Sequence, residues 1–290
     1  MPQIDWSLAD QWATVVTDYV VKVLNSNFAI ALVGGFVGAV GGALGAQHIA
    51  ERRRRSDLLI AELNSVNSAV MLSMMVCNTA LGLKKQLVKP LYENFKTAKV
   101  EYLKQLEKFS QDPKSIAGYN FTADLTTFAS PIIPIEALTN LVLQRLNTPG
   151  KATGLVPLLQ NAASGLGNAI AKREEIIARF KSGEISDRDR HWHYFGEKTS
   201  GGHQNREYSD IVEVIHSYKN DLIFFSASLC EALVKHGERV RSGVKRAPQS
   251  LPQVHAPDFS GPRKTGLFPP DSDYSSFQAW IVERETSAGK

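Results

Sequence analysis

The chain has 290 residues, of which 43% are hydrophobic and 21% are charged, a composition typical of folded protein. Its formal net charge of +4 is too small to indicate a nucleic-acid-binding protein, so we expect no nucleic-acid partner. Two cysteines, Cys77 and Cys230, are too few for a secreted disulfide scaffold. Both fall in apolar helical patterns, and we expect reduced core residues there.

Residues 1–27 contain the first predicted element, a short amphipathic helix. Trp6, Trp12 and Tyr19 recur with valines at three- and four-residue spacing, which indicates one apolar helix face. Trp and Tyr are enriched where a membrane meets water. We therefore predict an interfacial helix on the extracytoplasmic surface.

Residues 28–50 are predicted to form a transmembrane helix. From Phe28 to Ala46 the chain reads FAIALVGGFVGAVGGALGA, without one polar side chain. About 20 apolar residues are needed for a helix to cross the hydrocarbon layer. Because so many of these residues are glycine, the hydrophobicity is only moderate, and a buried glycine-rich core helix is the alternative.

The charges that flank this segment predict its orientation. Four consecutive arginines follow it, whereas residues 1–26 carry three aspartates and one lysine. Basic residues beside a membrane span stay in the cytosol, so the N-terminus is expected outside and the C-terminus in the cytosol. Anionic lipid headgroups would also attract this cluster. The topology residues are Arg52, Arg53, Arg54 and Arg55.

Small residues in the predicted span repeat every four positions and form two adjacent stripes, in the pattern of a glycine zipper. Residues four apart share a helix face, and small faces allow helices to approach closely in lipid. We therefore expect self-association into a homo-oligomer, or packing against a partner transmembrane helix. The predicted packing residues are Gly34, Gly35, Gly38, Ala39, Gly42 and Ala43.

Residues 51–241 are predicted to form a cytosolic, antiparallel helical bundle of coiled-coil type. Apolar residues recur at three- and four-residue spacing, and no alternating strand pattern competes with them. Pro90 is expected to kink or break the first helix near Lys89. The predicted helices are 56–109, 134–146, 154–180 and 207–241.

The uncharged stretch from Leu63 to Leu83 resembles a second span in its length. Its asparagines, serines and threonine are too polar for a helix that faces lipid. We therefore interpret it as the core helix of the bundle.

Residues 184–206 are predicted to form a polar loop with a possible short strand pair. On a strand, His191 and His193 would point the same way, and His203 would be the third ligand of a metal site. Such loops are common, however, so these histidines are weak candidates and we expect neither a metal nor another cofactor. Since the chain carries no nucleophile elbow and no Walker-type loop, it is not expected to be an enzyme.

Residues 242–290 contain six of the thirteen prolines and are predicted to form a flexible, partly disordered tail. Tyr274, Phe277 and Trp280 predict one short helix that docks on the bundle or on a partner.

These patterns favour a membrane-anchored interaction protein, a scaffold or sensor whose cytosolic bundle binds another protein. Two alternatives stay open. One is a membrane-permeabilising effector whose glycine-striped helix oligomerises, and the other is a membrane-anchored, metal-dependent enzyme.

Overall fold

The structure is a computed structural model of the full chain, and it is all-helical. Between the elements described, the β-pairing consists of one isolated bridge that joins Lys198 and Gln204. Of the predicted N-terminal helix, residues 14–18 and 21–22 are helical, whereas Trp6, Trp12 and Tyr19 lie outside the described residues. The structure describes residues 14–18, 21–22, 27–112, 122–147, 150–187, 189–198, 202–243 and 251–279.

The chain divides into two compact units, Met1–Leu59 and Ile60–Lys290. Helix α2 (Asn27–Leu83) belongs to both, since it begins in the first unit and ends in the second. The predicted membrane segment is therefore helical from residue 28 to residue 50 without a break.

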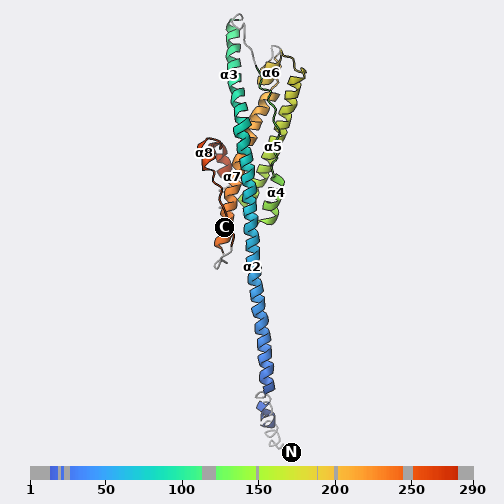
Figure 1. Ribbon diagram of the computed structural model, residues 1–290, viewed down its shortest axis with the longest axis vertical. Helices are drawn as coiled ribbons and strands as arrows, with labels where there is room; N and C mark the ends of the chain where they lie inside the picture. Colours follow the sequence, from blue (N-terminus) through green and yellow to red (C-terminus); the bar gives the residue numbers. More distant parts are fainter. Residues whose placement is uncertain are drawn as a thin grey trace, which may run out of the picture. The chain divides into compact units, whose positions relative to one another are not determined.

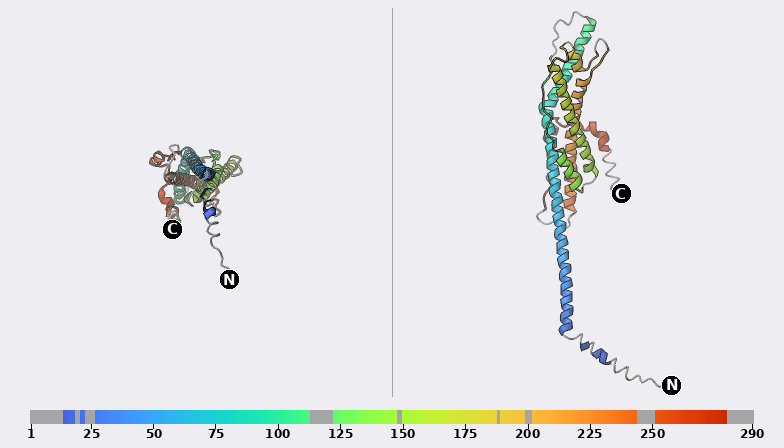
Figure 2. Two further views of the ribbon diagram at one scale, coloured as in Figure 1. Left: turned by 90° about the horizontal axis from the view of Figure 1, so that it is seen from below. Right: turned by 90° about the vertical axis from the view of Figure 1, so that its right-hand side faces the viewer.

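The second unit is a helical bundle with three long helical segments (Figures 1 and 2). The first continues from α2 through the π-helical turn η1 (Lys84–Val88) into α3 (Lys89–Gln111). The others are α5 (Gly150–Lys181) and α7 (Glu207–Ser242), which pack extensively against each other. Buried leucine, isoleucine, valine and alanine side chains from all three segments form one core.

The sequence predicted that Pro90 would kink or break the first helix near Lys89, and the structure shows no break there, since α2, η1 and α3 follow one another directly. The irregularity takes another form, a π-helical turn immediately before the proline, in which the amide of Lys89 donates to the carbonyl of Lys84. Pro90 then lies in the first turn of α3, where a proline removes no needed intrahelical hydrogen bond. The helix continues because the wider turn absorbs the missing donor.

The segment 122–134 is extended and leads into α4 (Ile135–Asn140) and the π-helical turn η2 (Leu141–Arg145). Leu138 and Val142 are buried and fix this short helical region to the core. Helix α5 begins four residues earlier than the predicted start at residue 154, and Pro157 lies inside the helix, as it did in the predicted range.

A second core cluster lies beside α6 (Arg190–Phe195) and is built mainly from aromatic rings. The rings of Tyr194 and Tyr208 stack with centroids 4.5 Å apart, and Phe95 packs against both. This short helix occupies part of the predicted loop 184–206, and a single antiparallel bridge between Lys198 and Gln204 follows it where the sequence suggested a short strand pair.

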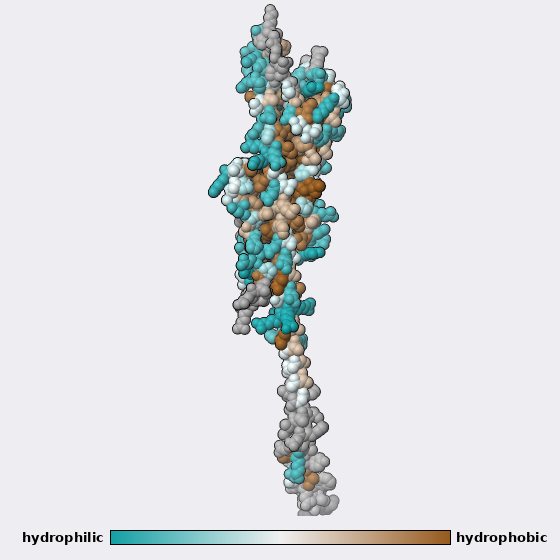
Figure 3. All heavy atoms as spheres, in the orientation of Figure 1, coloured by the Kyte–Doolittle hydropathy of each residue, from teal (hydrophilic) through white to brown (hydrophobic). Residues whose placement is uncertain are grey.

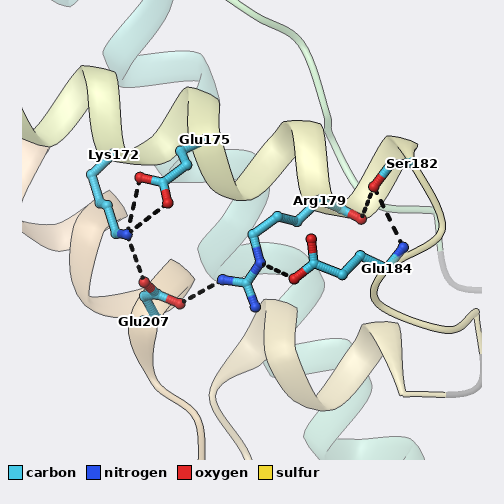
Figure 4. A network of polar contacts seen from close by, with 6 residues as sticks. All are labelled: Lys172, Glu175, Arg179, Ser182, Glu184 and Glu207. Carbon is cyan, nitrogen blue, oxygen red and sulfur yellow. Dashed lines mark hydrogen bonds and ion pairs between the residues drawn. The ribbon is translucent and has the colours of Figure 1, made fainter.

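The beginning of α7 is joined to α5 by a charged network (Figure 4). The carboxylate of Glu207 forms ion pairs with Lys172 at 3.3 Å and with Arg179 at 3.2 Å. One carboxylate in the first turn of α7 therefore binds two cations of α5. Glu175 and Glu184 complete the network at 3.0 Å and 2.9 Å from the same two cations. A carboxylate in the first turn of a helix also interacts favourably with the positive end of the helix dipole.

Part of the predicted flexible tail packs on the bundle. Residues 251–279 contain α8 (Ser260–Lys264) and the 3-10 helix η3 (Asp271–Tyr274), and Leu251, Phe259 and Tyr274 are buried. The ring of Tyr274 stacks on Phe224 of α7 at 3.8 Å. Docking therefore starts far earlier in the tail than the one short helix that was predicted, while Trp280 lies outside the described residues.

Candidate functional site

The predicted packing stripe lies in the part of α2 that belongs to the first unit, where the described glycines have open space beside them. A Cβ atom added at Gly35, Gly38 or Gly42 would meet no heavy atom of the chain within 4 Å. Ala39 and Ala43 are exposed, and the side chains around Gly34 lie outside the described residues. The small residues are therefore on a regular helix with open space around them.

The predicted topology residues Arg52–Arg55 follow on the same helix and are all exposed. Arg55 forms an ion pair with Glu51 one turn earlier, at 3.2 Å. An exposed pair of this kind contributes little to stability, so the cluster keeps nearly its full positive charge available to its surroundings.

Among the described residues, the helical stretch Gly38–Gln111 contains one segment that is long and apolar enough to cross a membrane, and half of that segment is buried inside the protein. The core helix of a soluble protein passes the same test of length and composition. Leu63, Val66 and Val70 are buried in the bundle core, in agreement with our interpretation of residues 63–83 as a core helix.

The structure does not bring the three candidate histidines together. His191 and His193 lie on α6, where residues two apart point to different sides of the helix, whereas the prediction assumed a strand. His191 packs its ring against Tyr102, with centroids 5.5 Å apart, and His203 lies in the following loop. Within the described residues, no group of three or more His, Cys, Asp or Glu side chains is placed to hold a metal ion.

A buried polar layer that the sequence analysis did not identify crosses the bundle at the π-helical turn η1. Lys219 has no exposed surface and lies on α7 between Ile215 and Leu222, both of which are also fully buried. Its Nζ is 3.5 Å from Nδ1 of His216. Across the interface, Nζ of the buried Lys84 donates to Oδ1 of Asn220 at 3.1 Å.

An aromatic and charged group lies beside this layer. The ring of Tyr92 stacks on His216 at 3.8 Å, and its hydroxyl donates to Glu213 at 2.9 Å. Glu213 also forms an ion pair with Lys96. The carboxylate of Glu213 is therefore already engaged by a tyrosine and another lysine.

Burial controls the protonation of the layer. Together with a smaller contribution from the nearby charge of Lys84, it lowers the pKa of Lys219 to about 7. Burial and the two lysines also lower the pKa of His216 to about 4, so the ring is neutral at neutral pH and Nδ1 can accept from Lys219. Burial and Lys89 lower the pKa of Lys84 as well. Burial raises the pKa of Glu213, but hydrogen bonds from Lys96 and Tyr92 outweigh this effect, so the pKa is lowered.

Lys219 has no exposed surface, so its amine is shielded from solvent, whereas His216 and Asn220 in the same layer are half-buried. A buried amine whose pKa lies near neutrality changes its charge within the physiological range, and each change alters the stability of the surrounding core. The sequence contained one signal of this buried layer. Position 219 continues the three- and four-residue spacing of apolar residues between Ile215 and Leu222 on α7, but a lysine occupies it.

A second buried cation, Arg173 of α5, has a structural role. It has no exposed surface, and its guanidinium donates to the carbonyl of Thr126 at 2.8 Å and to the hydroxyl of Tyr208 at 3.3 Å. It also lies 5.0 Å from the centroid of the Phe128 ring, within the range of a cation–π contact. Arg173 thus ties the extended segment 122–134 to α5 and α7.

Three comparisons with known proteins identified no relative of this chain. The sequence matches no protein-family model, and neither the curated proteins nor the solved structures contain a match to it.

Proposed function

We propose that this chain is a membrane-anchored interaction protein, a scaffold or sensor that acts through its helical bundle. In this proposal α2 crosses the membrane once between residues 28 and 50, with the N-terminus outside and the bundle in the cytosol. The small-residue stripes then pair with a second copy or with a partner transmembrane helix, and the bundle binds a cytosolic protein.

The observation that carries the proposal is the bare glycine-rich segment of the first unit. It is helical and apolar, and its described residues from Gly38 to Ala50 are exposed. In water each glycine within a helix costs about 1 kcal/mol relative to alanine, and an uncovered apolar helix of this kind has little to stabilise it. Lipid and a closely packed partner helix would each satisfy such a surface.

The bundle supports the proposal as a rigid interaction module. Contacts between the first segment and α7 pair rising with falling residue numbers: Ser73 with Ser226, Lys84 with Asn220, and Tyr92 with Glu213. These pairs support the proposed antiparallel arrangement. The docked tail and the mixed polar and apolar surface of the bundle (Figure 3) also suit a protein that binds other proteins.

Cysteine labelling in cells tests the anchoring and the orientation. The native Cys77 and Cys230 are both buried, so they contribute little background. We expect Ser7→Cys to react with a membrane-impermeant maleimide on intact cells, and Ser56→Cys to react only after the cells are permeabilised. Extraction of the chain by alkaline carbonate, or labelling of Ser56→Cys from outside, would contradict the proposal.

Cross-linking in membranes tests the packing face. We expect Gly38→Leu with Gly42→Leu to abolish cross-linked oligomers, because leucine prevents close backbone approach on the small face. Val40→Leu is the matched control, since it enlarges a residue outside the two stripes. Equal cross-linking of all three proteins would rule out the proposed face.

The second candidate, a membrane-permeabilising effector, rests on the same bare glycine stripe. A membrane-potential dye separates the two functions. An effector depolarises cells when the protein is expressed, and the Gly38→Leu, Gly42→Leu variant does not, whereas a scaffold leaves the potential unchanged in both.

A further inference from the structure

A pocket of about 570 Å³ lies between the segment that enters α4 and one face of α5. Two helix faces form its polar walls: Glu136, Thr139 and Asn140 on the side of α4 and η2, and Gln160 with Ser164 on α5. Residues spaced by three or four positions share a helix face, so these side chains converge on one space. The apolar part of the lining consists of Pro131, Ile133, Ile135 and Ala163.

Asn140 accepts a hydrogen bond from Nε2 of Gln144 at 3.5 Å, but another polar group of the pocket is left without a partner. The hydroxyl Oγ1 of Thr139 is buried and has no hydrogen-bond partner among the described residues. A buried hydroxyl without a partner is destabilising, so such a group calls for an explanation. Thr139 is one of the residues that line the pocket.

The charge of the lining indicates the kind of ligand. Glu136 is its single ionisable side chain, and no cationic residue lines the pocket to neutralise it. Glu136 also forms no ion pair within the described part of the chain. The amides and hydroxyls that surround it supply both donors and acceptors. This arrangement suits a positively charged group with polar atoms around it and a short apolar chain.

The position in the fold agrees with a binding role. Thr139 is followed directly by the π-helical turn η2, and such turns occur frequently at functional sites. Leu138 and Val142 are buried on either side of it, which fixes the wall of the pocket to the core. The volume falls in the range of small-molecule sites.

We propose that this pocket binds a small organic ammonium compound, with Glu136 pairing with the cation and Thr139, Gln160 and Ser164 providing hydrogen bonds. This site is independent of the membrane anchor and of the proposed oligomerisation. It would make the bundle a receptor for an amine ligand.

Isothermal titration calorimetry on the full chain in detergent micelles tests the proposal, with spermidine as the probe. We expect saturable binding at one site that Glu136→Gln weakens about tenfold, since the variant loses the negative charge that pairs with the ammonium group. Thr139→Val should weaken it about threefold without unfolding the protein, because valine replaces an unpaired hydroxyl. Glu107→Gln, an exposed carboxylate on α3, is the matched control and should bind as the unaltered chain does.

Three outcomes would overturn the proposal. The first is the absence of saturable binding to the unaltered chain. The second is equal binding by the Glu136→Gln variant, which would indicate nonspecific surface attraction. The third is equal binding of triethylene glycol, a neutral probe of similar size, which would show that the site does not select for ammonium.

Discussion

Nζ of Lys219 and Nδ1 of His216 lie 3.5 Å apart, one turn from each other on α7 and inside the helical core. The opposing segment contributes another buried lysine, Lys84, rather than a carboxylate. The bundle therefore carries positive charge in a place where water cannot solvate it, and its stability must depend on pH.

Replacing Lys219 by methionine should stabilise the bundle at neutral pH. Methionine fills the same space without a charge, and exchanging an unpaired buried charge for an apolar side chain is typically stabilising. We expect the free energy of unfolding at pH 7 to rise by about 1–4 kcal/mol, measured by chemical denaturation. Lys235→Met, on the exposed side of α7, is the control and should change it by less than about 0.5 kcal/mol. A destabilised Lys219→Met variant would contradict the assignment.

The unaltered bundle should become more stable as the pH rises from 7 to 9. Lys219 has an ordinary pKa of 10.5 when unfolded and about 7 when folded, so the unfolded state binds more protons in this window. The free energy of unfolding then increases with pH, by up to about 1.4 kcal/mol per unit for one group. The stability that the neutral amine provides is complete above pH 10.5 and is lost as the pH falls through 7.

The same measurement on Lys219→Met distinguishes this lysine from other groups, because the variant should lose most of the slope between pH 7 and 9. Cys77 and Cys230 act in the opposite direction only at higher pH, since burial raises the pKa of each thiol from 9.0, to about 11 and about 12. An unchanged slope in the variant would show that another group titrates.

Arg173→Met should destabilise the bundle by roughly 3 kcal/mol in urea denaturation. The substitution keeps apolar volume but removes the donors to the carbonyl of Thr126 and the hydroxyl of Tyr208, and hydrogen bonds to charged groups contribute about 1.5–3 kcal/mol each. Arg206→Met, which breaks only an exposed pair with Asp210, should cost less than about 1 kcal/mol. Similar effects of the two substitutions would disprove the structural role of Arg173.

Two glycines of α5 should respond to alanine in opposite ways. At Gly165 an added Cβ would lie 2.4 Å from the ring of Tyr218, whereas at Gly167 its nearest neighbour is Oγ of Ser130 at 3.5 Å. Gly167→Ala should therefore raise stability by up to about 1 kcal/mol through helix propensity. Gly165→Ala should lower it by about 1–2 kcal/mol, since crowding outweighs that gain. Thermal unfolding measures both, and stabilisation by Gly165→Ala would refute the close approach.

Tyr274→Ala should release the tail from α7. The substitution removes the stack on Phe224. It also removes the hydrogen bond that the hydroxyl of Tyr274 donates to Oδ1 of Asp221 at 2.8 Å. We expect faster amide hydrogen exchange in residues 251–279, while the rate in α5 stays unchanged. Ser276→Ala, at an exposed neighbouring position, should leave exchange as it is. Unaltered exchange in Tyr274→Ala would mean that other contacts hold the tail.

The sequence by itself determined the helical elements, because their apolar spacing is local and repeats over many turns. The periodicity placed the long helices α5 and α7 within a few residues of their observed ends, and it assigned Leu63–Leu83 to a core. The proposal of a membrane anchor and its orientation also rests on the sequence, on a local run of apolar residues and four arginines.

Only the tertiary structure decided features that depend on what lies opposite a residue. Whether Pro90 breaks a helix depended on the preceding π-helical turn, and whether His191 and His193 share a direction depended on α6 being a helix. The burial of Lys219 and the docking of Tyr274 both require a neighbour that is distant in the chain. Local periodicity determines which face a residue occupies, but solvation, and therefore charge, depends on the surface that covers that face.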